Sequence, residues 1–200
     1  MCFDATQGIL YTVIICINSV YSLASLFLPK VFEDKKIEGF YVGIVFSMYS
    51  IACVVISPII GKIIKRVGFA NLVAIGLVMM GISIAPIGYL KNIESKNTTL
   101  LLALLLRALQ GVASAAINTS CYSLAANKYK DNTEFIIGML EASAGIGLII
   151  GLLGGSAVYK FRGYSAVFVT FGTILEVMAF ISISLFVYLE RRERREAEGR

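Results

Sequence analysis

Long stretches without charge are the feature that most constrains this chain. Six follow one another, and each holds at most one Asp, Glu, Lys or Arg: residues 5–29, 40–61, 67–90, 97–127, 135–159 and 163–189. A helix needs about 20 apolar residues to cross the ~30 Å hydrocarbon core of a bilayer. The sequence therefore predicts an all-α membrane protein with six transmembrane helices, at about 8–28, 40–60, 69–90, 99–122, 135–158 and 164–188.

Composition excludes several other classes of protein. Of the 200 residues, 58% are hydrophobic and 16% are charged, whereas a soluble domain carries roughly 25% charged residues. The basic residues lie in short gaps between the apolar stretches, so the net charge of +5 favours a membrane surface over nucleic acid as the partner. We therefore expect the chain to lie in a lipid bilayer and not to bind nucleic acid.

The sequence also lacks the residue patterns that form common metal sites and hydrolase active sites. The chain has no histidine, and its cysteines (Cys2, Cys16, Cys53 and Cys121) form no CxxC pair, so they are interpreted as small hydrophobic residues. A membrane-embedded enzyme would need a catalytic pair near a membrane face, and none is found. We therefore expect no metal, no cofactor and no enzymatic activity.

The distribution of basic residues predicts the orientation. The first stretch is too long for a signal peptide and follows the acidic Asp4, so it is interpreted as a retained span. With the N-terminus in the cytoplasm, the inner gaps hold more Lys and Arg than the outer gaps, as the positive-inside rule requires. The sequon at Asn97 then lies outside. Residues 190–200 form a charged cytoplasmic tail that continues the last helix or starts a central linker.

Polar residues recur at helical spacing within three of the spans. They are Asn18, Ser22 and Ser25 in the first, Ser47, Ser50 and Ser57 in the second, and Arg107, Gln110, Gly111, Ser114, Asn118 and Cys121 in the fourth. Such stripes indicate either a shared aqueous cavity or hydrogen bonding between packed helices, and the second explanation is the simpler one for the serines. Arg107 indicates function, because a guanidinium within the membrane needs a carboxylate, carbonyls or water.

The fifth span separates two features by angle. Ser143, Gly147, Gly151 and Gly155 recur every four residues and form a ridge of small residues that favours close helix packing. Glu141 lies ~120–200° around the helix from that ridge, at about 100° per residue. It is expected to face a cavity and bind a proton or cation, with a structural hydrogen bond as the alternative. For Glu176 in the sixth span, both roles stay open.

Three segments carry a resemblance to a known family. Gly61–Gly68 (GKIIKRVG) resembles the loop motif GxxxDRxGRR, Leu106–Ala116 resembles the fourth-span motif RxxQG, and Gly147–Gly155 resembles the fifth-span motif GxxxGPxxGG. Together they resemble the amino-terminal half of the major facilitator superfamily. The resemblance implies two three-helix repeats.

Within that superfamily, Gly138–Gly151 and the following Tyr159 and Gly163-Tyr164 resemble the vesicular amine transporters, especially the polyamine branch. The resemblance implies antiport of protons and small organic cations in a vesicle, endomembrane or plasma membrane. Arg107 would organise the proton-linked network, Glu141 would bind proton or substrate, and Asn18, Ser22 and Gln110 would line the cavity. The residues expected in packing between halves or in gating are Gly61, Arg66, Gly68, Gly147, Gly151 and Gly155.

The sequence departs from the family in its motifs and its number of spans. Lys65 stands where the loop motif has Asp, Ala70 and Asn71 stand where it has basic residues, and Leu152 replaces the fifth-span proline. The superfamily has two six-span halves, so this chain is expected to be a fragment, a truncated product or a half that associates with a second half or a second copy. A monomer is expected not to transport, because the glycine ridge would face lipid. The alternative function is a non-transporting structural or regulatory subunit.

Overall fold

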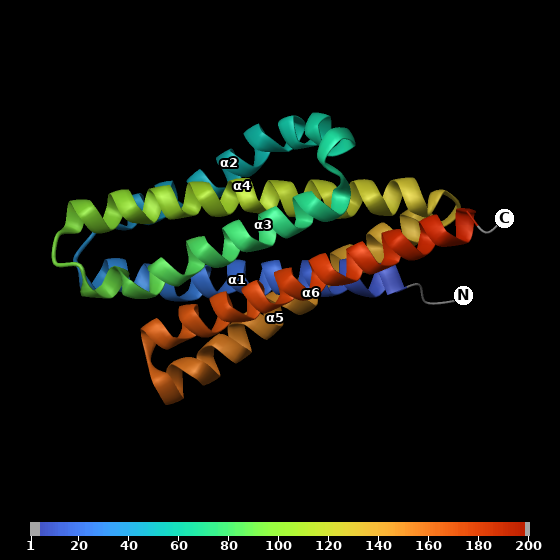
Figure 1. Cartoon of the computed structure of the whole chain (residues 1–200). Coiled ribbons are helices and arrows are strands. Elements are labelled where there is room, and N and C mark those ends of the chain that lie inside the picture. The colour runs from blue at the N-terminus through green and yellow to red at the C-terminus, as the bar shows by residue number, and fades with distance from the viewer. Residues whose placement is uncertain (1–4, 199–200) are drawn as a thin grey trace.

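Six long helices lie side by side and make up nearly the whole structure (Figure 1). The computed structural model describes residues 5–198. The helices are α1 (Ala5–Asp34), α2 (Gly39–Val67), α3 (Phe69–Ile84), α4 (Lys96–Lys128), α5 (Thr133–Arg162) and α6 (Tyr164–Glu198), with short 3₁₀ helices η1 (Ala85–Asn92) and η2 (Lys130–Asn132). The all-α fold with six long apolar helices is thereby confirmed.

Glycine and proline mark several of the helix ends. Gly68 and Gly163, at φ +88° and +81°, end α2 and α5, and their N–H groups donate to Ile64 O and Tyr159 O over 2.9 Å. Positive φ at the end of a helix strongly favours glycine. Pro86 stands at the start of η1, where α3 tightens into a 3₁₀ helix, because proline cannot supply the N–H that an α-helix interior requires.

Six segments are long and apolar enough, within the described residues, to cross a membrane, and the third of them consists of α3 together with η1. With 33 residues, α4 is ~50 Å long at ~1.5 Å per residue, so it extends beyond a ~30 Å hydrocarbon core. The apolar part of α6 lies at 164–181, but the helix continues to Glu198. The charged tail is therefore helical through residue 198, and residues 199 and 200 lie outside the described residues. Figure 1 places both termini at the same end of the bundle.

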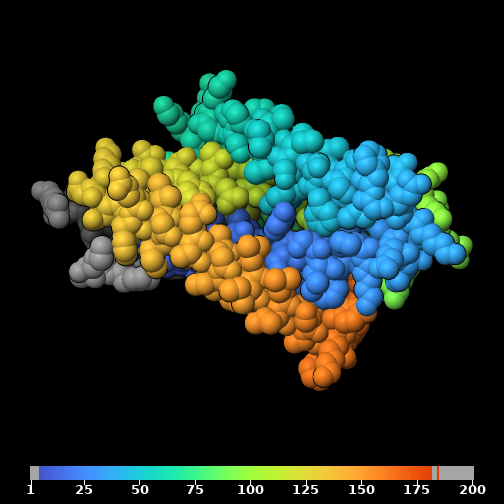
Figure 2. Space-filling view, turned by 180° about the vertical axis from the view of Figure 1, so that it is seen from behind, coloured from blue at the N-terminus to red at the C-terminus, as the bar shows by residue number. Residues whose placement is uncertain are grey.

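The helices pack in a pattern that agrees with two repeats. The most extensive contacts are between α1 and α5 and between α2 and α4, and α3 packs against both α4 and α6. In two three-helix repeats, α1 corresponds to α4 and α2 corresponds to α5. The α1–α5 contact in one repeat order is therefore the equivalent of the α4–α2 contact in the other. In the space-filling view, α1 (blue) is seen between α2 (cyan) and α5 (orange) (Figure 2).

The glycine ridge of α5 packs against α1 within the same chain. A Cβ on Gly147 would lie 3.0 Å from Asn18 Cβ, and one on Gly151 would lie 2.8 Å from Ser19 Cα. Ser19 Oγ donates to Gly147 O over 2.9 Å across this contact. The close helix packing expected of this ridge is thus made with α1. Packing of the ridge between two halves stays a prediction.

Candidate functional site

Arg107 lies fully buried in the middle of the bundle, enclosed by aromatic rings from two other helices. Its guanidinium carbon lies 4.6 Å from the centre of the Phe46 ring, 5.8 Å from that of Tyr49 and 5.9 Å from that of Tyr21. A guanidinium within about 6 Å of a ring centre is attracted by the negative face of the ring. The cation is thus stabilised by α1 and α2 as well as by α4.

The hydrogen bonding of Arg107 is incomplete. Nη1 donates to Gln110 Oε1 over 3.1 Å, one turn along α4. Nε and Nη2 of Arg107 and Nε2 of Gln110 are buried without a partner. Among the side chains that the structure describes, Arg107 contacts no carboxylate. Of the carboxylate, carbonyls or water expected from the sequence, the carboxylate is therefore not found there, and one amide and three rings surround the cation.

The polar stripe of α4 continues from Gln110 through Ser114 to Asn118. Ser114 Oγ accepts from Tyr49 Oη over 2.7 Å and from Asn118 Nδ2 over 2.9 Å. Gly111 allows this contact, because a Cβ there would lie only 2.8 Å from Ala52 Cβ on α2. The absence of a side chain at Gly111 thus brings α2 close enough for Tyr49 to reach α4.

Glu141 is held by a residue that the sequence did not single out. Tyr122 Oη donates to Glu141 Oε1 over 2.7 Å, from α4 to α5. Glu141 is exposed on the surface of the bundle, and Tyr122 is half-buried. The sequence pattern could have indicated Tyr122, because it follows Asn118 by four residues and so extends the polar stripe of α4 by one turn.

Two residues expected to line the cavity lie in the α1–α5 interface instead. Ser22 is buried and donates to Leu148 O over 2.9 Å, which corrects its assignment as a cavity residue and agrees with hydrogen bonding between packed helices. Asn18 is half-buried, donates to Ile14 O over 2.9 Å, and lies beside Gly147. Neither residue is among the hydrogen-bond partners of Arg107.

The residues of the loop motif lie at the end of α2. Gly61 and Arg66 are exposed on the last two turns of that helix, and Gly68 forms the turn into α3. Gly68 thus has a conformational reason to be glycine whatever its part in gating.

In the sixth span, Glu176 packs against α3. A Cβ on Gly81 would lie 2.9 Å from its Cδ, so the glycine leaves room for the carboxyl group. This packing leaves both roles of Glu176 open.

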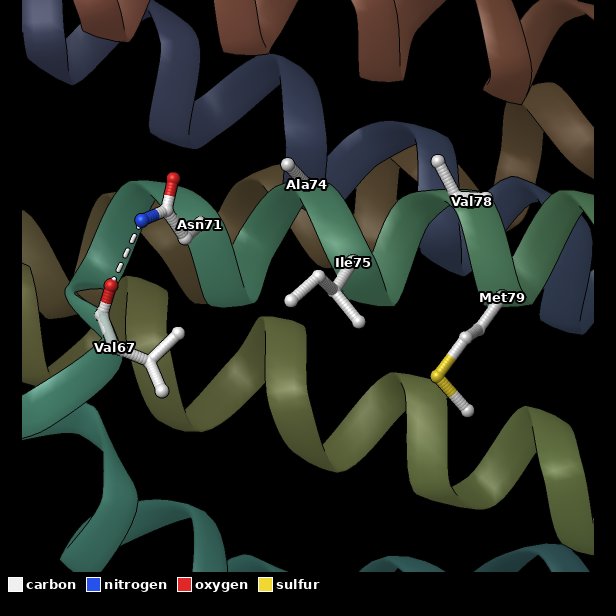
Figure 3. Close-up of a pocket in the computed structure, with 6 residues that line it drawn as sticks. All are labelled: Val67, Asn71, Ala74, Ile75, Val78 and Met79. Atoms are coloured by element: carbon white, nitrogen blue, oxygen red, sulfur yellow. Dashed lines mark hydrogen bonds between the residues drawn. The ribbon is translucent and has the colours of Figure 1, made fainter.

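A shallow groove of about 490 Å³ runs along α3 (Figure 3). It is lined by Val67, Asn71, Ala74, Ile75, Val78 and Met79, which are not the residues that surround Arg107. Its single amide, that of Asn71, donates to Val67 O over 2.9 Å. The groove therefore offers a mainly apolar surface to a ligand.

Fold and motifs together define a class of membrane protein. The model of the Major Facilitator Superfamily matches residues 10–200, and the chain belongs to this family. More particularly, it is 25% identical to the human MFS-type transporter SLC18B1 over 158 residues, which are 79% of this chain and 35% of that protein. It is 26% identical to the human synaptic vesicular amine transporter over 170 residues, 83% of this chain and 31% of that protein.

A bacterial relative is similar to the same degree. The multi-drug resistance efflux pump PmrA homolog of Lactococcus lactis is 25% identical over 171 residues, 84% of this chain and 40% of the pump. The chain thus spans about a third of the length of the curated relatives it matches. The relatives agree with an integral multi-pass protein of a vesicle or plasma membrane, as the sequence predicted.

Proposed function

We propose that this chain forms part of a transporter that exchanges protons for a small organic cation, such as an amine or polyamine, with Glu141 as the group that both ligands occupy in turn. The observation that carries the proposal is the carboxyl group of Glu141, exposed on an apolar span and oriented by Tyr122. A carboxylate within a membrane span is costly and rare, so it is by default a candidate for binding a ligand or a proton.

The names of the relatives support the chemical class of the substrate. One is named a synaptic vesicular amine transporter, one an MFS-type transporter and one a multi-drug resistance efflux pump. Membership of the superfamily supports transport across the membrane. A proton and an ammonium group both bind a carboxylate, and they exclude each other there. Antiport follows when this competition is linked to a change between inward and outward access.

Arg107 has a different part in this proposal. Its buried positive charge would repel a cationic substrate, so it serves the polar network of α4 rather than the substrate. Gln110 orients its Nη1, and Tyr49 connects the same stripe to α2 through Ser114. For Gly61, Arg66 and Gly68 we propose gating at the α2–α3 turn.

The test is Glu141→Gln in the protein that carries this chain, reconstituted in liposomes. The amide keeps size and hydrogen bonding but cannot take up a proton, so uptake of labelled amines driven by a pH gradient should fall about tenfold or more, the loss expected when one charged partner is removed. Glu134→Gln is the matched control, because Glu134 is exposed in the first turn of the same helix.

The outcomes distinguish the proposal from its alternative. Coupled uptake that survives in Glu141→Gln would make Glu141 structural. No uptake by the unaltered protein under any gradient would favour the non-transporting subunit, for which Lys65 in place of the motif's Asp is the supporting observation.

A further inference from the structure

Three nitrogen donors at Arg107 and Gln110 have no hydrogen-bond acceptor. They are Nε and Nη2 of Arg107 and Nε2 of Gln110, all buried and without a hydrogen-bond partner. The exposed fractions of the two side chains are 0% and 1%. Buried donors of this kind normally find a partner. Because all three are N–H groups and two of them belong to a cation, the matching partner is an acceptor with negative charge.

The unpaired nitrogens of Arg107 lie on one edge of the guanidinium. Nε–H and Nη2–H point in parallel from the same side of the plane, which is the edge that takes the two oxygens of a carboxylate or a single halide. Nη1 lies on the other side and is occupied by Gln110 Oε1. That bond uses the amide oxygen of Gln110, and its NH₂ group is a further buried donor beside Arg107.

The chain supplies no carboxylate for this edge among its described residues. Glu141 accepts from Tyr122, and Glu176 packs against Gly81 of α3. The stretches 5–29, 40–61 and 67–90, which form most of α1, α2 and α3, contain no acid at all. The rings of Tyr21, Phe46 and Tyr49 attract the guanidinium through their faces, but they do not satisfy the N–H groups at its edge. A buried charge without a counter-ion is costly.

We propose that Arg107 and Gln110 form a binding site for a small monovalent anion, either a halide or a single carboxylate group. The covering rings belong to three half-buried side chains, so the walls of the site reach the surface of the bundle. Tyr21 from α1 and Tyr49 from α2 lie over the guanidinium with their ring centres 5.0 Å apart. The site is separate from Glu141 and Tyr122 and does not depend on the proposed transport.

Chloride binding to the purified 200-residue chain in neutral-lipid nanodiscs tests this site. With gluconate as the background anion, the width of the ³⁵Cl NMR signal reports bound chloride. We expect saturable broadening for the unaltered chain. Arg107→Gln removes the guanidinium, and Gln110→Glu places a carboxylate of the chain itself beside Arg107. Each variant should therefore weaken chloride binding about tenfold or more, as the loss of a charge-assisted hydrogen bond requires.

Arg162→Gln is the matched control, because it removes the same charge from an exposed position at the end of α5 and should leave the broadening unchanged. Acetate added in competition distinguishes the two ligands: displacement of chloride assigns a carboxylate to the site, and failure to displace assigns a halide. Thermal melting checks that each variant is folded. If Arg107→Gln does not fold, Gln110→Glu alone still tests the site. Absence of saturable broadening in the unaltered chain, or equal broadening in a folded Arg107→Gln or Gln110→Glu variant, would overturn the proposal.

Discussion

At the scale of single residues, the hydrogen bond between Tyr122 and Glu141 gives the sharpest expectation. The phenol donates over 2.7 Å and so holds the carboxyl group in one orientation. Tyr122→Phe removes this donor and keeps the ring. Under the proposed function, amine uptake driven by a pH gradient should fall about tenfold or more, because a hydrogen bond to a charged group contributes ~1.5–3 kcal/mol.

Uptake of labelled amines into liposomes with an imposed pH gradient measures this loss. Tyr41→Phe serves as the control, since Tyr41 is an exposed tyrosine near the start of α2. Uptake by Tyr122→Phe equal to that of the unaltered protein would show that the phenol does not act on Glu141 during exchange.

The sequence identified Arg107 and Glu141 because each is a lone charge in an apolar span. It could not identify the rings around Arg107, since Tyr21 and Tyr49 come from α1 and α2 and meet α4 only after packing. It also placed Ser22 in a cavity, because a polar stripe on one helix is the same pattern whether it faces water or the carbonyls of a neighbour such as Leu148.

At the scale of helices, the ridge on α5 was predictable as a close contact, but its partner was not. Spacing of four residues aligns Gly147, Gly151 and Gly155 on one face of a helix, whereas the identity of the opposing helix depends on the whole bundle. The structure assigns that place to α1. The same limitation applies to Gly111, whose small size serves the α2–α4 contact.

Gly151→Val should therefore destabilise the bundle. A Cβ at this position would meet the backbone of Ser19, and backbone cannot move aside as a flexible side chain can. Overpacking of this kind costs ~1–3 kcal/mol, so the melting temperature in detergent should fall. Gly145→Ala is the control on the same helix: a Cβ there meets nothing within 4 Å, and alanine is the better helix former. Equal melting temperatures for Gly151→Val and the unaltered chain would contradict the tight α1–α5 contact.

At the scale of the whole molecule, the number of spans followed from hydropathy alone, but the outward faces did not. In their most apolar parts, α2 and α5 have 11% and 28% of residues buried, against 56% for α1, α3 and α4. All these helices are similarly apolar, because in a membrane a lipid-facing surface and a packed surface have the same composition. Only the packing distinguishes them, so the faces available to lipid or another polypeptide come from the structure.

Orientation in the membrane gives the last prediction, and it concerns all six spans at once. With an even number of spans, both termini and the α2–α3 and α4–α5 connections lie on one side, and the remaining connections lie on the other. The larger number of basic residues on the first side places it in the cytoplasm. Single cysteines in a cysteine-free chain, at the exposed positions Lys91 and Lys160 outside and Lys62 and Asp131 inside, should therefore separate into two classes. A membrane-impermeant maleimide applied to intact cells with the protein in the plasma membrane should label the first pair, and the second pair only after the membrane is opened. Labelling of Lys62→Cys together with Lys91→Cys in sealed cells would mean that α3 does not cross the bilayer, and labelling of only the second pair would reverse the orientation.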